Sequence, residues 1–340
     1  MPEATRITAP QGSPAAHFHD LDDLNHAVSG SELEVVQLKP GGLDVALTQV
    51  SLGDLSIDLG TVNVPLRVQG RLDPQRFSVG AFFPGARGTW NGHYIDESQL
   101  LYFVPGKELN GFLSEGYGWA SLVIPPDWMA SIAQTAWRSN MLQLTTNCRT
   151  IRPAPESLAD LWQATAHIVS PATLPDGPSP ADWLTADLRN ALGAALSTLD
   201  TPPVKVMSRA LAHFSMAHRA ERYLRERIAE PICIDELCVA MHASRRYLEY
   251  AFTDAFGTSP SRYLRLLRLH EVRHRLKLLG ARTTVTAEAL RLGFNHLSLF
   301  SIQYKKAFGE SPSTTLVQAT APTGRRRLPG PPLDLHADYR

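Results

Sequence analysis

A duplicated segment near the C-terminal end constrains the fold of this chain more than any other feature. Residues 255–260 read AFGTSP and residues 307–312 read AFGESP, so the two copies are offset by 52 residues. Within each copy the aligned apolar residues lie on one face of a helix, because they recur every three or four positions. The aligned pairs are Leu248 and Phe300, Phe252 and Tyr304, Ala255 and Ala307, and Phe256 and Phe308. The sequence therefore predicts two copies of one helical unit.

Each copy also carries a short apolar helix before the long one. The short helices are expected over residues 234–241 and 286–292, and only residues 242–244 and 293–295 separate them from the long helices. Two helices joined by so tight a turn have the layout of a helix-turn-helix. A single helical hairpin is weak evidence, because most such hairpins bind nothing. Two copies in register indicate a DNA-binding domain much more strongly.

The distribution of charge supports this interpretation. The chain has no net charge, but residues 205–340 hold 22 Lys and Arg against 12 Asp and Glu, a net charge of +10. Residues 1–204 hold 11 against 21, a net charge of −10. A basic segment joined to an acidic one suggests that only the basic part meets a polyanion, although a solvated basic surface is an alternative on charge alone.

The segment between the two copies predicts a rigid spacer. Ser259-Pro260, and Ser311-Pro312 in the second copy, match an N-cap serine followed by proline at the first helical position. No glycine or proline interrupts residues 261–279, which would form a helix of about 28 Å at 1.5 Å per residue. Successive major-groove faces on one side of DNA lie about 34 Å apart. The spacer therefore suits two recognition helices in adjacent turns of the duplex.

If the aligned apolar residues point inward, the opposite face of each long helix is available to DNA. Arginine pairs bidentately with guanine, a carboxylate accepts from cytosine, and serine bonds to either base edge. Any one of these side chains could equally be a solvated surface residue, so the prediction concerns the face as a whole. The expected base-reading residues are Arg246, Glu249, Tyr250 and Thr253 in the first unit, and Asn295, His296, Ser298, Ser301 and Ile302 in the second; Arg245, Lys305 and Lys306 are expected to contact phosphate.

Over residues 212–316 the chain resembles the AraC family of bacterial transcription regulators. The resemblance rests on the segments HASRRYLEYAFTDAFGTSPSRYLRLLRLHEVRHRL and ALRLGFNHLSLFSIQYKKAFGESP. It implies two helix-turn-helix units joined by a long helix, binding to double-stranded promoter DNA and recruitment of RNA polymerase. Members usually carry a second domain for effector binding or dimerisation, which suits the front half of this chain.

Two details refine the resemblance. The runs Ser244–Arg246 and Arg268–Arg273 are similar, more weakly, to the ethanolamine-utilisation regulators within the family. Leu299 and Ile302 depart from the family pattern, because they make the second recognition helix less polar than in many relatives. This departure predicts looser base specificity in the second unit.

The front half has the pattern of an antiparallel β domain with appended helices. Val62, Val64, Leu66 and Val68 alternate with small or polar residues, and glycine and proline punctuate the runs. Short alternating strands of this kind predict a sandwich or a cupin-like barrel. After Pro126 the period changes to that of helices, expected over 127–144, 156–169 and 180–199.

The expected fold is thus α+β with two domains. The predicted divisions are a disordered N-terminus over 1–28, an effector-binding or dimerisation domain over 29–200 (β-rich 30–125, helical 126–200), a linker over 201–208, a double helix-turn-helix domain over 209–318, and a disordered tail over 319–340.

The predicted function is sequence-specific transcription regulation in the cytoplasm in response to a small-molecule effector of unknown identity. Trp90, Tyr94 and Trp119 are the candidate pocket residues, although aromatic residues at such spacing are more often plain core. An effector-independent homodimeric regulator is the first alternative. A DNA-targeted enzyme is the second; it would use Cys148, with Arg149 lowering the pKa of its thiol.

Other classes of protein are not indicated by the sequence. The three cysteines lack the spacing of a disulfide framework or a zinc site, and the pair His17 and His19 has no third ligand nearby in the sequence. No nucleotide-binding glycine loop, nucleophile elbow or HExxH motif occurs. No apolar run approaches the roughly 18 residues that span a bilayer. We therefore expect no metal, no cofactor, no enzyme activity and no membrane partner.

Overall fold

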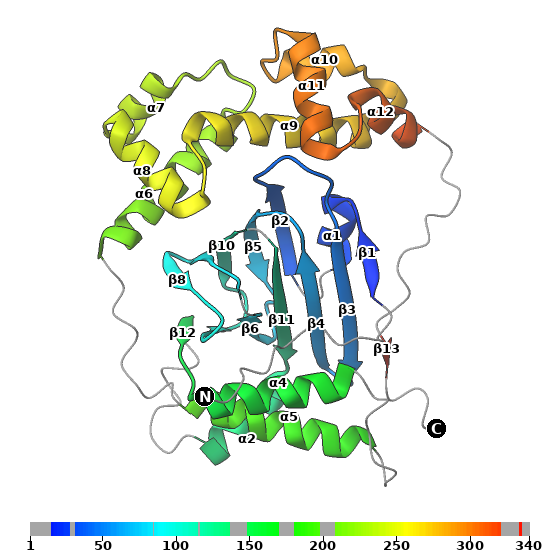
Figure 1. Cartoon of the computed structure of the whole chain (residues 1–340), viewed down its shortest axis with the longest axis vertical. Helices are drawn as coiled ribbons and strands as arrows, with labels where there is room; N and C mark the ends of the chain where they lie inside the picture. Colours follow the sequence, from blue (N-terminus) through cyan, green and yellow to red (C-terminus); the bar gives the residue numbers. More distant parts are fainter. Residues whose placement is uncertain are drawn as a thin grey trace.

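The computed structural model describes residues 15–27, 31–83, 85–114, 116–136, 148–169, 180–197, 208–320 and 333–334. Its strands lie between two groups of helices (Figure 1). The strands of the N-terminal part are β1 Ala16–Phe18, β2 Ser31–Gln37, β3 Val45–Leu52, β4 Leu55–Val62, β5 Leu66–Leu72, β6 Phe77–Phe82, β7 Gly88–Trp90, β8 His93–Ile95, β9 Leu100–Phe103, β10 Glu108–Leu113, β11 Tyr117–Ile124 and β12 Arg149–Ile151. The helices of this part are α1 Leu21–Ala27, α2 Pro126–Ala136, α4 Pro155–Val169 and α5 Pro180–Leu196.

These strands form two antiparallel sheets that pack face to face. One sheet has the order β1-β3-β4-β11-β6-β9-β12, and the other has the order β2-β5-β10-β7-β8. Of the two architectures predicted from the sequence, the structure is thus the sandwich. Together with the helical C-terminal region described below, it confirms the predicted fold class.

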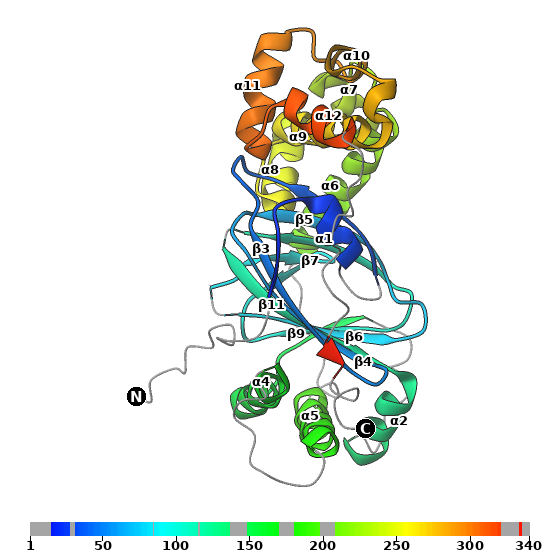
Figure 2. The same ribbon diagram turned by 90° about the vertical axis from the view of Figure 1, so that its right-hand side faces the viewer.

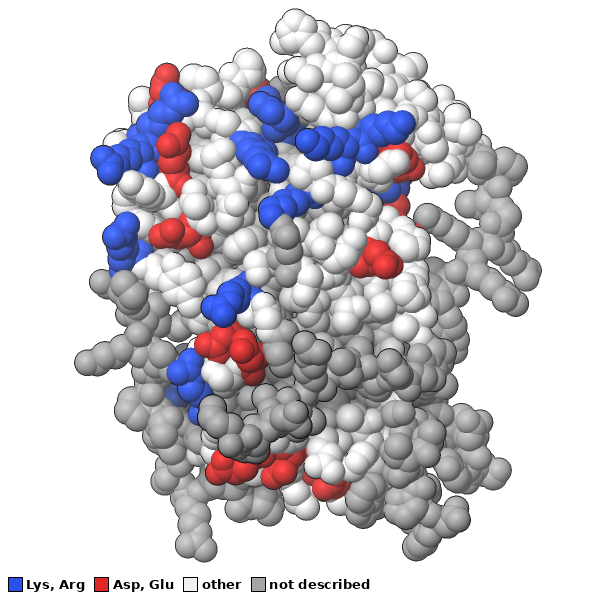
Figure 3. Space-filling model, viewed as in Figure 1, with Lys and Arg blue, Asp and Glu red and all other residues white. Residues whose placement is uncertain are grey.

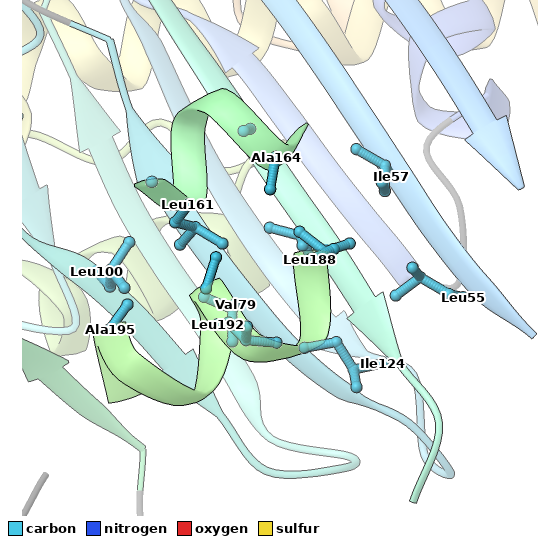
Figure 4. Packing of buried hydrophobic residues seen from close by; sticks show 14 of the residues in the cluster. Leu55, Ile57, Val79, Leu100, Ile124, Leu161, Ala164, Leu188, Leu192 and Ala195 are labelled. Carbon is cyan, nitrogen blue, oxygen red and sulfur yellow. The ribbon is translucent and has the colours of Figure 1, made fainter. Parts of the chain in front are cut away.

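The alternating direction of side chains along a strand decides which core each of them joins. On β9, Leu101 and Phe103 face the second sheet, whereas Leu100 and Tyr102 face the helices on the other side. Successive side chains of a strand point to opposite faces, so one strand serves two hydrophobic cores. Figure 4 shows the second of these cores, in which Leu161 of α4 and Leu188 of α5 pack over the sheet.

The predicted disorder of residues 1–28 is wrong for residues 15–27. These residues form β1 and α1, and β1 pairs with β3. Phe18, Leu21 and Leu24 are buried in the core between the sheets. Three large apolar side chains separated by polar ones were too few to reveal this from periodicity. Residues 1–14 lie outside the described residues, as does most of the predicted tail, of which Leu333–Asp334 pairs with β3 as β13.

The C-terminal helices form a layer over one end of the sandwich (Figures 1 and 2). They are α6 Ser208–Glu226, α7 Ile234–Met241, α8 Arg245–Phe256, α9 Pro260–Leu279, α10 Val285–Arg291, α11 Leu297–Phe308 and α12 Pro312–Thr320, with a 3-10 turn at Gly280–Arg282. Residues 201–207 of the predicted linker lie outside the described residues.

Strand β2 joins the sandwich to this helical layer. Val35 is buried in the core between the two sheets, whereas its neighbour Val36 is buried among α6, α8 and α9. The Gln37 side-chain amide donates to the carbonyl of Ala307 on α11 at 3.2 Å. The Thr89 hydroxyl donates to the carbonyl of Ala255 on α8, also at 3.2 Å. Both helix-turn-helix units therefore contact the β domain.

A buried ion pair lies at the centre of this contact. Arg67 of β5 is fully buried, and its Nη2 lies 2.7 Å from Oε2 of Glu221 on α6, which is also buried. The Arg67 guanidinium also donates to Asn110 and to backbone carbonyls, and it stacks over the Phe256 ring at 4.9 Å. Tyr263 of α9 donates to the other carboxylate oxygen. We call the set Arg67, Glu221 and Tyr263 the interdomain clasp.

The positively charged side chains around Glu221 explain why its carboxyl group is ionised. Burial by itself would raise the pKa of Glu221, but the Arg67 guanidinium, the His218 ring at 3.6 Å and the nearby Arg225 hold that pKa well below its ordinary value. Arg225 lies 3.1 Å from Glu221 and also pairs with Glu34 of β2. The carboxylate therefore stays ionised in the folded protein.

The clasp gives a first prediction. Glu221→Gln leaves the Arg67 charge buried without its partner, so the free energy of unfolding should fall by about 3–5 kcal/mol. Urea unfolding measures the change. Because the pKa of Glu221 is lower in the folded than in the unfolded protein, this carboxylate adds its full stabilisation at pH values above the ordinary pKa of a carboxyl group. The stabilisation is lost as the pH falls toward the folded-state pKa. The difference between the two proteins should therefore shrink in acid.

The matched control is an exposed pair on the same sheet. Glu108 and Arg71 lie 3.8 Å apart with most of both side chains in solvent. Glu108→Gln should change the free energy of unfolding by at most about 1 kcal/mol. Equal losses for Glu221→Gln and Glu108→Gln would contradict the role given to the clasp.

Candidate nucleic-acid interface

The first helix-turn-helix unit consists of α7 and α8. The turn between them places His242 in the left-handed region, with φ +52°, and its N–H closes the end of α7. The hydroxyl of Ser244 then accepts from the N–H of Tyr247 at 3.2 Å and caps the start of α8. Such a cap satisfies one of the free N–H groups at a helix start, so it defines where the recognition helix begins.

The second unit consists of α10 and α11 and uses a different turn. Gly293 supplies the left-handed residue, with φ +81°, a conformation that glycine adopts without steric cost. Thr284 caps α10 through the N–H of Ala287. No side-chain hydrogen bond caps α11 at His296. The sequence placed both helix pairs correctly, within a few residues at their ends.

The long helix α9 joins the two units as predicted. Ser259 is its N-cap and Pro260 its first residue, although the serine hydroxyl makes no capping bond. In the second copy the Ser311 hydroxyl does cap, because it accepts from the N–H of Thr314 at 3.1 Å. With 20 residues, α9 is about 30 Å long at 1.5 Å per residue.

The inner faces of both recognition helices are apolar, as the duplication predicted. Leu248, Phe252 and Phe256 of α8 are buried, with the Phe252 and Phe256 rings edge to face. On α11, Phe300 and Tyr304 are buried against Phe294 and Phe308. This packing leaves the opposite face of each helix in solvent.

The outer face of α8 carries polar side chains that contact one another. The Arg246 guanidinium donates to the Tyr250 hydroxyl at 3.2 Å and lies over the same ring. Arg245 lies 3.5 Å from the carboxylate of Glu249. These contacts span one helical turn and hold both arginines extended along the helix surface. Arg246, Glu249, Tyr250, Thr253 and Arg245 are all exposed.

The outer face of α11 is less polar. Asn295 and His296 lie at its start, and Ser301 donates its hydroxyl to the carbonyl of Leu297 at 2.9 Å. Ile302 is 66% exposed. Every expected residue of the second unit is in solvent: Asn295, His296, Ser298, Ser301, Ile302, Lys305 and Lys306.

Both outer faces belong to one side of the molecule. In Figure 2, α8 and α11 lie on the same side of the helical layer, with α6, α7 and α10 toward the other. Figure 3 shows that Lys and Arg gather over the helical layer on this face, whereas the end formed by α4 and α5 shows acidic side chains. A basic face with two exposed helices is suited to a negatively charged duplex.

Part of the predicted pocket also exists. A cavity of about 120 Å³ lies between the two sheets, and Trp90 and Trp119 line it together with Phe82, Phe103 and other apolar residues. Tyr94 does not line it, because this residue is on β8 with 55% of its surface exposed. The structure thus brings together two of the three candidate pocket residues.

The activated cysteine of the enzyme alternative is not supported. Burial raises the pKa of the Cys148 thiol, even though a hydrogen bond with Val104 and the charge of Lys107 oppose the rise. Arg149 is not among the groups that shift it. A raised pKa leaves the sulfur as a thiol, which is a poor nucleophile.

Two further candidates can be compared with the structure. His17 and His19 both lie near Asp44, at 3.2 and 3.7 Å, but among the described residues no group of three or more His, Cys, Asp or Glu side chains could hold a metal ion. Within the same described part of the chain, no helix has both the length and the apolar character to cross a bilayer.

Comparison with known proteins agrees with this geometry. Residues 237–318 match the family model described as a helix-turn-helix domain. The XylDLEGF operon transcriptional activator of Pseudomonas putida is 35% identical over 101 residues, which cover 29% of this chain and 32% of that protein. The probable thc operon regulatory protein of Rhodococcus erythropolis is 34% identical over 95 residues, 28% of this chain and 29% of that protein.

Among solved structures, the AraC-like transcriptional activator CuxR aligns with 78% of this chain and 96% of its own, at 14% identity and a TM-score of 0.41. The chain spans about a third of the length of the curated relatives it matches. The C-terminal region is a helix-turn-helix domain. The two curated relatives that it matches are, by their names, an operon regulatory protein and an operon transcriptional activator.

The duplication supplies a matched pair for a second prediction. Gly257 and Gly309 close α8 and α11 at equivalent positions, with φ +64° and +75°. A Cβ on Gly257 would lie 2.5 Å from the Phe112 ring of β10, whereas on Gly309 it would meet nothing closer than 3.9 Å. Gly309→Ala should cost about 1–2 kcal/mol of backbone strain.

Gly257→Ala should cost clearly more than Gly309→Ala, because the Phe112 ring must also move. Urea unfolding of both variants measures the difference in the free energy of unfolding. Equal losses would show that the contact of Gly257 with the β domain is unimportant for stability.

Proposed function

We propose that this protein is a sequence-specific, DNA-binding transcription regulator that contacts promoter DNA through the outer faces of α8 and α11. One observation carries the proposal: two equivalent recognition helices are exposed on the same side of a single connecting helix. A length of about 30 Å for α9 approaches the 34 Å or so between successive major-groove faces. Two helical hairpins without a binding role would have no reason to expose equivalent helices on the same side of α9.

The chemistry of each face gives each residue its role. Arg246, preoriented by Tyr250, pairs with guanine, and Glu249 accepts from cytosine. The exposed Lys305 and Lys306, together with Arg245, contact phosphate and fix the register of the protein on the duplex. In this proposal the side chains that reach base edges in the second unit are those of Asn295, His296, Ser298, Ser301 and Ile302.

The β domain is proposed to sense a small apolar effector in the cavity that Trp90 and Trp119 line. The cavity is largely apolar and lies between the sheets, and β5, which carries Arg67 of the clasp, also contributes to its wall. A ligand there can therefore influence the position of the recognition helices. The same proposal places the protein in the cytoplasm, with RNA polymerase and a second copy of the chain as partners of the kind the family resemblance implies.

The first test of this function concerns Arg246. Arg246→Ala removes a bidentate base contact, so binding to duplexes selected by the full-length protein should weaken by about 1–3 kcal/mol and lose specificity at one base position. Arg71→Ala, an exposed arginine on β5, is the control and should change neither quantity. Fluorescence anisotropy with the selected duplex and its single-base variants measures both. An unchanged specificity profile for Arg246→Ala rules out its role.

The second test separates phosphate contact from base reading. Lys305→Ala should weaken binding about equally for all sequences and reduce the slope of log affinity against log salt by about 1. Titrations at several salt concentrations measure the slope. A loss confined to one base position, with the salt slope unchanged, would show that Lys305 reads a base instead.

A further inference from the structure

Helix α11 leaves large apolar side chains in solvent where a DNA-reading helix usually carries polar ones. Ile302 is 66% exposed and Leu299 is 52% exposed. The upper right part of Figure 3, over α10 and α11, accordingly shows uncharged residues. Exposed apolar surface is unfavourable in water, so a cluster of it at a binding face indicates a partner with an apolar feature.

The helical geometry puts these side chains at the centre of the outer face. Residues of an α-helix are about 100° apart, so Ile302 lies about 200° from the buried Phe300 and nearly opposite the core. Ser298 and Leu299 flank it on the preceding turn, and Lys305 and Lys306 flank it on the following turn. Ile302 is therefore the residue that would go deepest into a groove.

The equivalent position in the first unit has the opposite chemistry. Shifting by 52 residues aligns Ile302 with Tyr250 and Ser298 with Arg246, and those two residues of α8 are joined by a hydrogen bond. The first unit thus presents donors and acceptors at its centre. The second unit presents the alkyl side chain of Ile302 beside the small side chain of Ser298, so a binding partner can approach the helix closely there.

The major groove has one apolar feature of the right size, the C5-methyl group of thymine. We propose that α11 reads thymine through contact of Ile302 and Leu299 with these methyl groups, while α8 reads bases by hydrogen bonds. This inference rests on the proposed DNA-binding function and names the base class that the second unit recognises. The sequence predicted looser base specificity for the second unit; this proposal instead predicts that the second unit prefers thymine-rich half-sites.

Two observations favour DNA over a protein partner for this apolar face. The only ionised side chains of α11 are Lys305 and Lys306, one turn from Ile302, and α11 contains no carboxylate that would repel phosphate. The face also lies on the same side of the helical layer as α8. A protein partner would have to occupy the surface that the first unit directs toward the duplex.

The experiment compares thymine with deoxyuridine, which lacks only the methyl group. Duplexes are first selected by the full-length protein from a randomised 40-base-pair pool, and the enriched duplex is then remade with single thymines replaced by deoxyuridine. At a cluster of thymines, each replacement should weaken binding about fourfold, the value for losing burial of one methyl-sized group. At other positions the replacement should have no effect.

Three variants assign the effect to α11. Ile302→Ala should clearly reduce the difference in affinity between the thymine and deoxyuridine duplexes of this cluster and leave only the part that Leu299 contributes. Tyr250→Ala, at the equivalent position of α8, should keep the thymine preference there. Val317→Ala on α12 removes an equally exposed apolar side chain, 66% exposed, and should leave both affinity and preference unchanged. Thermal melting of all variants checks folding.

The outcomes separate this inference from the proposed function. If the protein enriches no duplex at all, the DNA-binding function itself fails. If it binds tightly but is insensitive to deoxyuridine everywhere, the function stands and thymine reading by α11 is wrong. If Ile302→Ala keeps the full thymine preference, another residue reads the methyl groups and the assignment to Ile302 is wrong.

Discussion

The arrangement of the whole molecule depends on an arginine and a glutamate that meet in a place without water. Arg67 comes from the middle of a sheet and Glu221 from the first helix of the helical layer, 154 residues later. Removing two charges from water is costly, and a close pair offsets that cost only when its remaining polar atoms are bonded as well. Here the backbone carbonyls of Val68 and Gly111 and the side chain of Asn110 accept from Arg67, and Tyr263 and Arg225 donate to Glu221, although Nε of Arg67 has no partner. The pair fixes which surface of α6 meets the sheet and therefore where both units lie.

The two helix-turn-helix units share the same pattern of buried apolar residues but differ in their contacts with the β domain. The first is packed against the β domain through Phe112 and Thr89, whereas the contacts of the second include the hydrogen bond from Gln37 to Ala307. They also differ in the turn, where His242 in one copy and Gly293 in the other takes the left-handed conformation. A shared core preserves the fold, and the surface is free to diverge because changes there cost little stability.

Much of this could be predicted from the sequence because the governing signals are local. The spacing of Leu248, Phe252 and Phe256 is enough to define the inner face of α8, and its outer face follows by geometry. The alternation of Val62, Val64, Leu66 and Val68 likewise predicts strands of a sandwich or a barrel, and only the structure distinguishes the two. The position of Tyr94 was missed because one aromatic side chain in a short strand carries no information about the face it occupies.

The clasp could not be predicted at all. In the sequence Arg67 is one polar residue in an alternating strand, where the ordinary interpretation is a solvent-facing side chain. Its burial depends on a helix far along the chain, and no local pattern encodes such a partner. The same reasoning applies to β1 and α1, whose few apolar residues become meaningful only beside β3.

One consequence follows from the way β2 is built. Two consecutive valines of this strand belong to different hydrophobic cores. Val35 lines the cavity between the sheets, whereas Val36 packs beneath α6 and α8. A strand is stiff across neighbouring residues, so a molecule that pushes on one valine moves the other in the same direction. Any ligand that displaced Val35 would therefore also disturb the packing of Val36 against α6 and α8.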